Sequence, residues 1–215
     1  QQNHYFLFSS RLKSLLSTGF IPLTPSLESI ASYLYFGYFP QDMTPIVGVN
    51  KLLPSHFLIY HFGGSLTIGS YWSYSSYFEK KMTKQDNVIT QDLTKELAKA
   101  VDKRVPEQKK APLGCFLAGG LGSASVACTL KNKSITPIGF SVGVKGQNDE
   151  EIESAKVVSK ELGIPHEIDY ITKETLLDGF AETIWQLDEP IGDPNVVAAA
   201  KLAKNASLKT NTLFS

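Results

Sequence analysis

The sequence has few cysteines, no net charge and no long apolar run, and each of these features excludes a class of protein. Two of its 215 residues are cysteine, which excludes a scaffold held together by disulfides. Lysine and arginine together number 21, as do aspartate and glutamate, so electrostatic attraction to nucleic acid or to an anionic membrane is not expected. No apolar run approaches the ~20 residues of a membrane span. We therefore predict neither a nucleic-acid partner nor a membrane partner.

Targeting and metal-binding patterns are also missing. Neither a secretory signal nor a lipidation motif opens the sequence, and this predicts a cytoplasmic protein. Cys115 and Cys128 fall on a predicted strand and a predicted helix, where they are expected to fill apolar space in a reducing compartment. These cysteines and the four histidines show no recognisable ligand spacing, so no metal site is predicted from them.

The hydrophobic pattern changes near residue 80 and divides the chain into residues 1–80 and 81–215. The first part has short β-rich runs at 5–8, 56–61 and 65–68 and an apolar helix at 27–36. The second part alternates helices with strands. Such alternation predicts an α/β fold with a mostly parallel, Rossmann-like sheet. Ligands of such sheets bind at the carboxyl ends of the strands.

Helix boundaries in the second part are indicated by capping residues. Asp149 is a predicted N-cap, and Gly163 stands where the helix that follows Asp149 should end. Asp193 and Pro194 are predicted as the N-cap and first residue of a helix over 195–203.

The most informative segment is an apolar strand that leads through glycines into a helix, at residues 116–125. Successive backbone N–H groups and the helix dipole make such a loop a cradle for an anion. The loop is neither a Walker A motif, since no Gly-Lys-Ser/Thr follows the glycines, nor Gly-x-Gly-x-x-Gly. Phosphate binding is therefore the functional interpretation, and a tight strand–helix turn is the structural one.

The loop resembles the pyrophosphate loop of the ATP-pyrophosphatase superfamily, whose usual form is Ser-Gly-Gly-x-Asp-Ser. Ala118 stands at the family's serine and Gly122 at its aspartate. The wider likeness is to the glutamine-dependent asparagine synthetase family. It is carried by ordered segments along nearly the whole chain, which are residues 5–16, 36–40, 48–56, 110–127, 137–143, 149–167 and 187–194.

This resemblance implies an ATP-dependent ligase. A carboxylate, most commonly the aspartate side chain, would be adenylated and then captured by ammonia from glutamine to give asparagine. ATP and Mg²⁺ are the expected small-molecule partners beside a small carboxylate substrate. A homodimer is left open. Residues 1–80 would be the last part of a glutaminase-like domain, and residues 81–215 the first part of the ATP-binding domain.

The resemblance also implies which residues lie at the site. ATP and pyrophosphate would be bound by Leu117, Ala118, Gly119, Gly120, Leu121, Gly122, Ser123, Ser125, Ser141, Val142 and Gly143. Gly143 has a turn as its alternative. Asp188 and Glu189 are candidates for contact with substrate or metal, or else form a helix end before Pro190. His166 is interpreted as structural.

Both ends of the sequence depart from the family pattern. Gln1 stands where a glutaminase domain would begin with a nucleophilic cysteine. Ser215 aligns with the first residue of the family's Ser-Gly-Asp-Gly-Gly-Asp-Glu motif. We therefore expect an internal piece or a truncated relative.

The substitutions at residues 118 and 122 leave three interpretations. The chain is a ligase with a modified loop, a catalytically inactive nucleotide-binding or scaffold protein, or a nucleotide-sensing module. Because Gly122 offers no side-chain ligand, no metal ligand is assigned within the chain.

Overall fold

The computed structural model describes residues 5–78, 84–107, 112–146 and 149–215. Gln1 and the predicted boundary near residue 80 lie outside these ranges. The chain forms two compact units, of which the first comprises Gln1–Thr83 and Ile184–Asp193, and the second Lys84–Thr183 and Pro194–Ser215. Residues 184–193 thus fold with a part of the chain that lies more than 100 positions earlier.

The first unit contains short helices and a β-hairpin. Its elements are α1 (Leu12–Leu16), α2 (Leu27–Phe36), β1 (His56–Tyr60), β2 (Leu66–Ser70) and the 3-10 helix Ser75–Tyr77. The predicted helix 27–36 is confirmed: Ser26 caps its first turn through the Ser29 N–H, and Gly37 ends it at a φ of 77°. The predicted strand at 5–8 is wrong, because the structure gives these residues no strand partner.

The second unit is built on a four-stranded parallel sheet. Its strands are β3 (Leu113–Phe116), β4 (Ile138–Val144), β5 (His166–Ile171) and β6 (Thr212–Phe214), in the order β5-β4-β3-β6. The helices are α3 (Asp86–Asp102), α4 (Leu121–Asn132), α5 (Glu150–Leu162), α6 (Lys173–Leu187) and α7 (Asn195–Ala206), and α6 continues into the first unit. The predicted α/β fold with a parallel sheet is confirmed.

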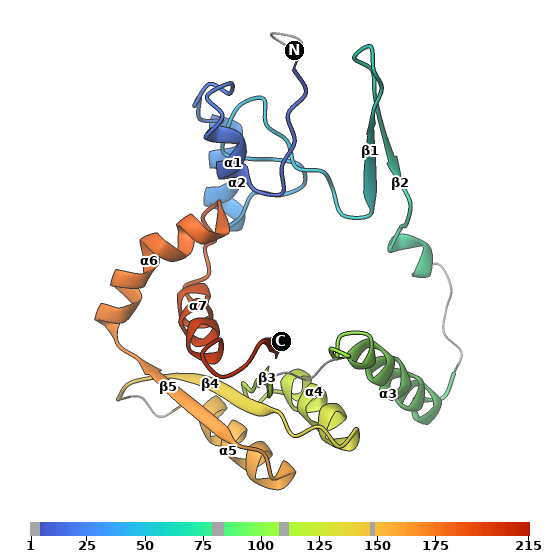
Figure 1. The fold of residues 1–215 in the computed structure, drawn as a ribbon, viewed down its shortest axis with the longest axis vertical. Coiled ribbons are helices and arrows are strands. Elements are labelled where there is room, and N and C mark those ends of the chain that lie inside the picture. Colours follow the sequence, from blue (N-terminus) through green and yellow to red (C-terminus); the bar gives the residue numbers. More distant parts are fainter. Residues whose placement is uncertain (1–4, 79–83, 108–111, 147–148) are drawn as a thin grey trace. The chain divides into compact units, whose positions relative to one another are not determined.

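Helices cover both faces of this sheet (Figure 1). Leu113, Cys115 and Leu117 alternate along the chain and pack into one apolar cluster with residues of α3, α4 and α5. Phe116 and Phe140 lie in a second cluster with residues of α7. This period of two is what a strand buried on both faces requires.

The ends of two helices test the capping predictions. Asp149 accepts hydrogen bonds from the N–H groups of Glu151 and Ile152, and Gly163 ends α5 in the left-handed region at a φ of 58°, so both predictions are confirmed. The prediction for Asp193 is wrong by one residue, because Pro194 occupies the N-cap of α7. Proline has no side-chain oxygen to cap the helix.

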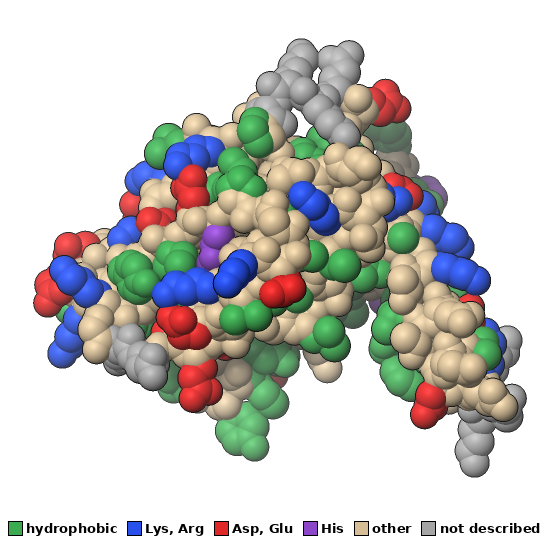
Figure 2. Space-filling model, turned by 90° about the horizontal axis from the view of Figure 1, so that it is seen from below, with side chains coloured by type: hydrophobic (Ala, Val, Ile, Leu, Met, Phe, Trp, Pro, Cys, Tyr) green, Lys and Arg blue, Asp and Glu red, His purple; other side chains and the backbone are tan. Residues whose placement is uncertain are grey.

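The surface carries charges of both signs, and the Cys115 thiol is buried. Acidic and basic side chains are interspersed on the face that Figure 2 presents. Within the described ranges, no helix has the length and hydropathy to cross a bilayer. Burial raises the pKa of the Cys115 thiol to about 11, so this thiol stays protonated at neutral pH.

Candidate functional site

The glycine-rich loop joins the carboxyl end of β3 to the start of α4. Gly119 adopts a φ of +73°, which favours glycine, and a Cβ at this position would lie 2.5 Å from the Glu151 carbonyl oxygen and 3.0 Å from the Ala155 nitrogen. Backbone atoms of α5 cannot move aside as a flexible side chain can. Only glycine therefore lets the loop pass this close to α5.

The first turn of α4 presents free backbone donors at the end of this loop. Gly120 is the N-cap, and no side chain caps the helix. The N–H groups of Leu121, Gly122 and Ser123 thus belong to the first turn, where an α-helix has no carbonyl of its own to pair with them. The dipole of this 12-residue helix adds partial positive charge. The geometry can hold a phosphate or another anion.

Ser123 holds the loop together in this structure. Its hydroxyl oxygen accepts the Ala118 N–H at 3.2 Å and donates to the Gly120 carbonyl at 3.1 Å. Ser125 lies in α4, where its carbonyl accepts the Thr129 hydroxyl. Phosphate binding by the two serine side chains stays a prediction.

The remaining loop position, Gly122, is not required by packing. A Cβ there would meet no heavy atom within 4 Å, so a longer side chain has room. The donors present do not fit Mg²⁺: Gly122 brings no side chain, and no group of three or more His, Cys, Asp or Glu that could hold a metal ion occurs among the described residues.

The end of β4 contributes the other predicted nucleotide-binding residues. Ser141 is buried, and its hydroxyl donates to the Leu117 carbonyl. Val142 packs against the apolar cluster on the α7 side. Gly143 lies within β4, so the turn alternative is wrong. A Cβ at Gly143 would lie 3.0 Å from an Ile152 side-chain carbon.

His166, which the sequence indicates to be structural, hydrogen-bonds to β4 and α5. Its Nε2 lies 2.6 Å from the Ser141 hydroxyl oxygen, and its Nδ1 lies 3.2 Å from that of Ser159 in α5. Burial, followed by the positive charge of Lys156, lowers the pKa of His166 from its ordinary value. Sequence reasoning missed this link to Ser141, which has no sequence signal because the two residues are 25 positions apart.

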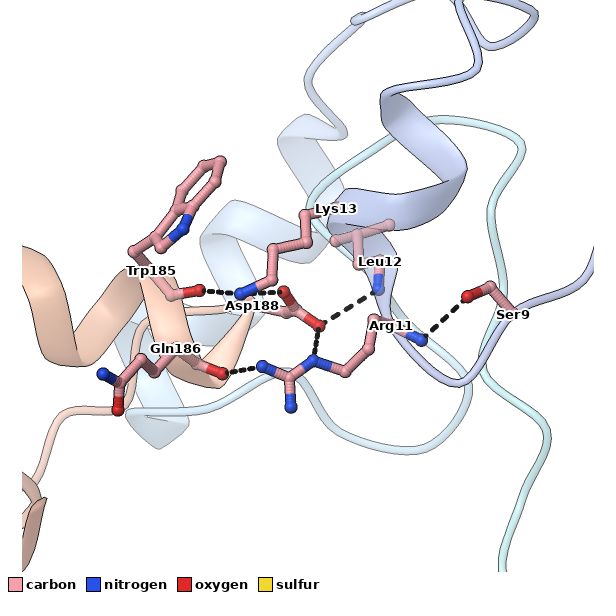
Figure 3. Close-up of polar contacts among 7 residues, drawn as sticks. All are labelled: Ser9, Arg11, Leu12, Lys13, Trp185, Gln186 and Asp188. Carbon is pink, nitrogen blue, oxygen red and sulfur yellow. Dashed lines mark hydrogen bonds and ion pairs between the residues drawn. The ribbon is translucent and has the colours of Figure 1, made fainter. Parts of the chain in front are cut away.

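Asp188 and Glu189 each pair with a cation of the first unit. Figure 3 shows Arg11 and Lys13 directed at the Asp188 carboxylate. This carboxylate lies 3.0 Å from Arg11 Nε and 3.4 Å from Lys13 Nζ. Glu189 lies 2.7 Å from Lys51 Nζ. These pairs support the interpretation as a helix end, and contact with substrate or metal stays a prediction.

Arg11 and Lys13, the two cations that pair with Asp188, also donate hydrogen bonds to carbonyls of the last turn of α6. Lys13 donates to the Trp185 carbonyl at 2.6 Å, and Arg11 donates to that of Gln186 at 2.5 Å (Figure 3). Positive charge at a helix C-terminus is favourable because the terminal carbonyls carry partial negative charge.

Comparison with known proteins identifies the family. The family model described as asparagine synthase matches residues 92–214, more than half of the chain. Asparagine synthetase [glutamine-hydrolyzing] 1 of Bacillus subtilis is 26% identical over 95% of this chain and 31% of its own length. A putative asparagine synthetase [glutamine-hydrolyzing] 2 of Methanocaldococcus jannaschii is 28% identical over 94% of this chain and 39% of its own. The amidase chry2 of Gibberella zeae is 25% identical over 81% of this chain and 30% of its own.

The chain thus spans less than two fifths of the length of each of these relatives. The matched range contains β3, the glycine loop, α4 and β4, which together make up the candidate site. The chain belongs to the asparagine synthase family.

Proposed function

We propose that this chain carries the nucleotide-binding part of an ATP-dependent carbon–nitrogen ligase. The observation that carries the proposal is the loop from β3 to α4, where Gly119 allows close approach to α5 and the first turn of α4 has no side-chain cap. Backbone N–H groups at such a place favour the charge of a triphosphate and of departing pyrophosphate.

The reaction proposed for the whole protein is amide formation. A carboxylate oxygen attacks the α-phosphorus of ATP, the bond from that phosphorus to the bridging oxygen breaks, and pyrophosphate leaves. Ammonia then displaces AMP from the acyl-adenylate. The N–H groups of α4 would hold the departing pyrophosphate without any side-chain charge. Because they are fixed by the helix, they need no reorganisation when the charge develops.

The substrate is proposed from the names of the relatives. Two of the three relatives described above are named glutamine-hydrolysing asparagine synthetases, and the third is named an amidase. We therefore propose aspartate as the carboxylate and glutamine as the source of ammonia. A cytoplasmic location and a homodimer remain predictions, which cell fractionation and light scattering can check.

The loop sequence supports a second candidate from another class, a nucleotide-binding protein without catalytic activity. Ala118 lacks the hydroxyl of the family's serine, and Gly122 lacks the carboxylate of its aspartate. Such a protein would bind ATP with an affinity insensitive to Mg²⁺, because the charged ligand is missing.

ATP–pyrophosphate exchange in the presence of aspartate separates the two candidates. In the whole protein, we expect Ala118→Ser combined with Gly122→Asp to raise exchange by about 10²-fold or more over the protein with the unmodified loop. The substitution at Gly122 requires no repacking of neighbouring residues, since a Cβ there would meet no heavy atom within 4 Å. Glu96→Gln, which changes an exposed side chain of α3 outside the loop, is the control and should leave exchange unchanged. A folded double variant that binds ATP and shows no exchange would contradict the ligase proposal and favour the binding protein.

A further inference from the structure

A chain of hydrogen bonds crosses three neighbouring strands next to the glycine loop. It begins at His166, the first residue of β5, passes through the Ser141 hydroxyl of β4 and ends at the carbonyl of Leu117, the residue that follows β3. Leu117 is fully buried, and its N–H also donates to the Phe140 carbonyl at 2.8 Å. The peptide groups on both sides of Leu117 are thus held by β4, two residues before Gly119.

The single hydroxyl proton of Ser141 determines which nitrogen of His166 carries hydrogen. The Leu117 carbonyl can only accept, so Ser141 must donate its proton there. Toward His166 the Ser141 oxygen must then accept, which requires hydrogen on Nε2. The contacts thus assign the Nε2–H tautomer, or the doubly protonated ring, and exclude the Nδ1–H tautomer.

The other side of the imidazole faces α5. Nδ1 lies 3.2 Å from the Ser159 hydroxyl oxygen, which donates to the Lys156 carbonyl at 2.9 Å. Because Ser159 has a single hydroxyl proton, it can donate to Nδ1 only by giving up the Lys156 carbonyl. The same helix lies against Gly119. A Cβ added at Gly119 would lie 2.5 Å from the Glu151 carbonyl oxygen and 2.6 Å from the Ser154 Cβ. α5 therefore contacts the loop directly at Gly119, whereas His166 reaches the loop from its other nitrogen, through Ser141 and Leu117.

We propose that His166 is a positioning residue for the pyrophosphate loop, acting through the Ser141 hydroxyl on the Leu117 carbonyl. This inference rests on the proposed function only for the identity of the ligand; the positioning itself concerns the loop. A loop that presents backbone N–H groups to phosphate depends on the orientation of its peptide planes. Loss of the Nε2–H leaves the Ser141 oxygen without its donor and loosens the peptide at the start of the loop.

Two conservative variants of His166 separate the roles of its nitrogens. His166→Gln places an amide N–H donor near the position of Nε2 and keeps the bond to Ser141. His166→Asn has a shorter side chain, whose amide reaches only the level of Nδ1. A merely structural role for the ring would treat both variants alike, whereas positioning through Nε2 predicts rescue by Gln and not by Asn.

The first readout is amide hydrogen exchange of residues 117–123 in the full chain without nucleotide. We expect His166→Asn and Ser141→Ala to raise the exchange rate of this segment about five- to tenfold, the effect of losing one hydrogen bond. His166→Gln should stay within about twofold of the unmodified chain. Ser159→Ala is the matched control, because it removes a serine from the opposite nitrogen, and it should also stay within about twofold.

Two outcomes would overturn the inference. One is unchanged exchange of residues 117–123 in Ser141→Ala, which tests the same link without altering the imidazole. The other is equal acceleration in His166→Gln, His166→Asn and Ser159→Ala. Exchange in α7, on the other face of the sheet, reports whether a variant has loosened the whole unit, and it should not change.

Titration of ATP into the same proteins separates this inference from the proposed function. Where the loop binds ATP, the affinity should fall about five- to tenfold in Ser141→Ala and His166→Asn and be kept in His166→Gln. Failure of the unmodified chain to bind ATP would contradict the proposed ligand. The exchange pattern would then still decide whether His166 positions the loop.

Discussion

Gly119 and Gly120 are neighbours in the loop, but a side chain at each position meets different surroundings. Gly119 has a positive φ, and its Cβ position lies 2.6 Å from Ser154 Cβ and 2.5 Å from the Glu151 carbonyl. Gly120 has a φ of −77° and no heavy atom within 4 Å of its Cβ position. One glycine is thus required by both backbone conformation and packing, and the other by neither.

We expect Gly119→Ala to lower the free energy of unfolding of the second unit by about 2–4 kcal/mol, since it adds backbone strain to a steric clash. Gly120→Ala should change it by less than about 0.5 kcal/mol. Urea unfolding followed by far-ultraviolet circular dichroism measures both. Equal losses in the two variants would contradict the view that α5 constrains the loop at Gly119.

His166 makes the stability of the second unit depend on pH. Burial and the charge of Lys156 lower its pKa in the folded protein from the ordinary 6.5. The unfolded chain therefore takes up a proton on this residue at a higher pH than the folded chain does. The contribution of neutral His166 to the free energy of unfolding is fully present above pH 6.5. It decreases as the pH falls through this value toward the folded pKa.

Substitution by a side chain that does not titrate should remove this dependence. We expect the unmodified chain to lose stability relative to His166→Gln between about pH 7.5 and about pH 5.5. The check is a pair of urea unfolding curves at each pH. If the stability difference between the two proteins stays constant with pH, His166 does not carry the effect.

At the scale of elements, the end of α6 is held by charges from the N-terminal segment. Asp188 has a φ of 72°, and its side chain is 11% exposed between Arg11 and Lys13. Its Oδ2 accepts the Leu12 N–H at 3.2 Å, and Lys13 also lies 5.0 Å from the Trp185 ring centre. These contacts join α1 to the end of α6 within the first unit.

Asp188→Asn keeps the size of the side chain and tolerates the left-handed backbone, so it tests the charge alone. We expect a loss of about 1–2 kcal/mol in the free energy of unfolding, because Arg11 and Lys13 would then face each other without a carboxylate. Both tryptophans, Trp72 and Trp185, belong to the first unit, so their fluorescence reports its unfolding.

Asp42→Asn is the matched control for this charge, because Asp42 belongs to the same unit as Asp188 and is exposed. Removing an exposed charge has little effect, so the change in the free energy of unfolding should be within about 0.5 kcal/mol. A control variant as damaging as Asp188→Asn would indicate a general effect of charge and would contradict a specific clamp.

At the scale of the whole molecule, the chain leaves its first unit, builds most of the second and returns for ten residues. The returning segment is attached along its length to the rest of the first unit. Examples are Asp188 with Arg11, Glu189 with Lys51, and the Gly192 N–H with the Gly37 carbonyl at 2.7 Å. α6 is one continuous helix, yet its residues before and after Thr183 belong to different units.

Native-state hydrogen exchange in low urea should divide α6 at this point. We expect residues 184–193 to open together with α2, and residues 173–183 to open with the sheet of the second unit. Asp188→Asn should speed exchange in the first group and leave the second unchanged. A single opening free energy for the whole of α6 would contradict this division.

Local signals in the sequence were sufficient for much of the fold. The helix at 27–36, the N-cap at Asp149 and the helix end at Gly163 depend on residues within a few positions of each other. The position of the glycine loop between β3 and α4 follows from the same local alternation. The predicted strand at 5–8 was wrong because a strand requires a partner, and local alternation cannot supply one.

The sequence by itself determined the α/β class and the loop at residues 116–125, because hydrophobic period, caps and glycine spacing are local properties. Its resemblance to asparagine synthetases indicated the family. Only the tertiary structure decided which residues support the loop and which hold the end of α6. Ser141 meets Leu117 across 24 positions, and Asp188 meets Arg11 across 177. Such pairs form where strand register and helix packing bring distant segments together, and residue types alone do not encode that proximity.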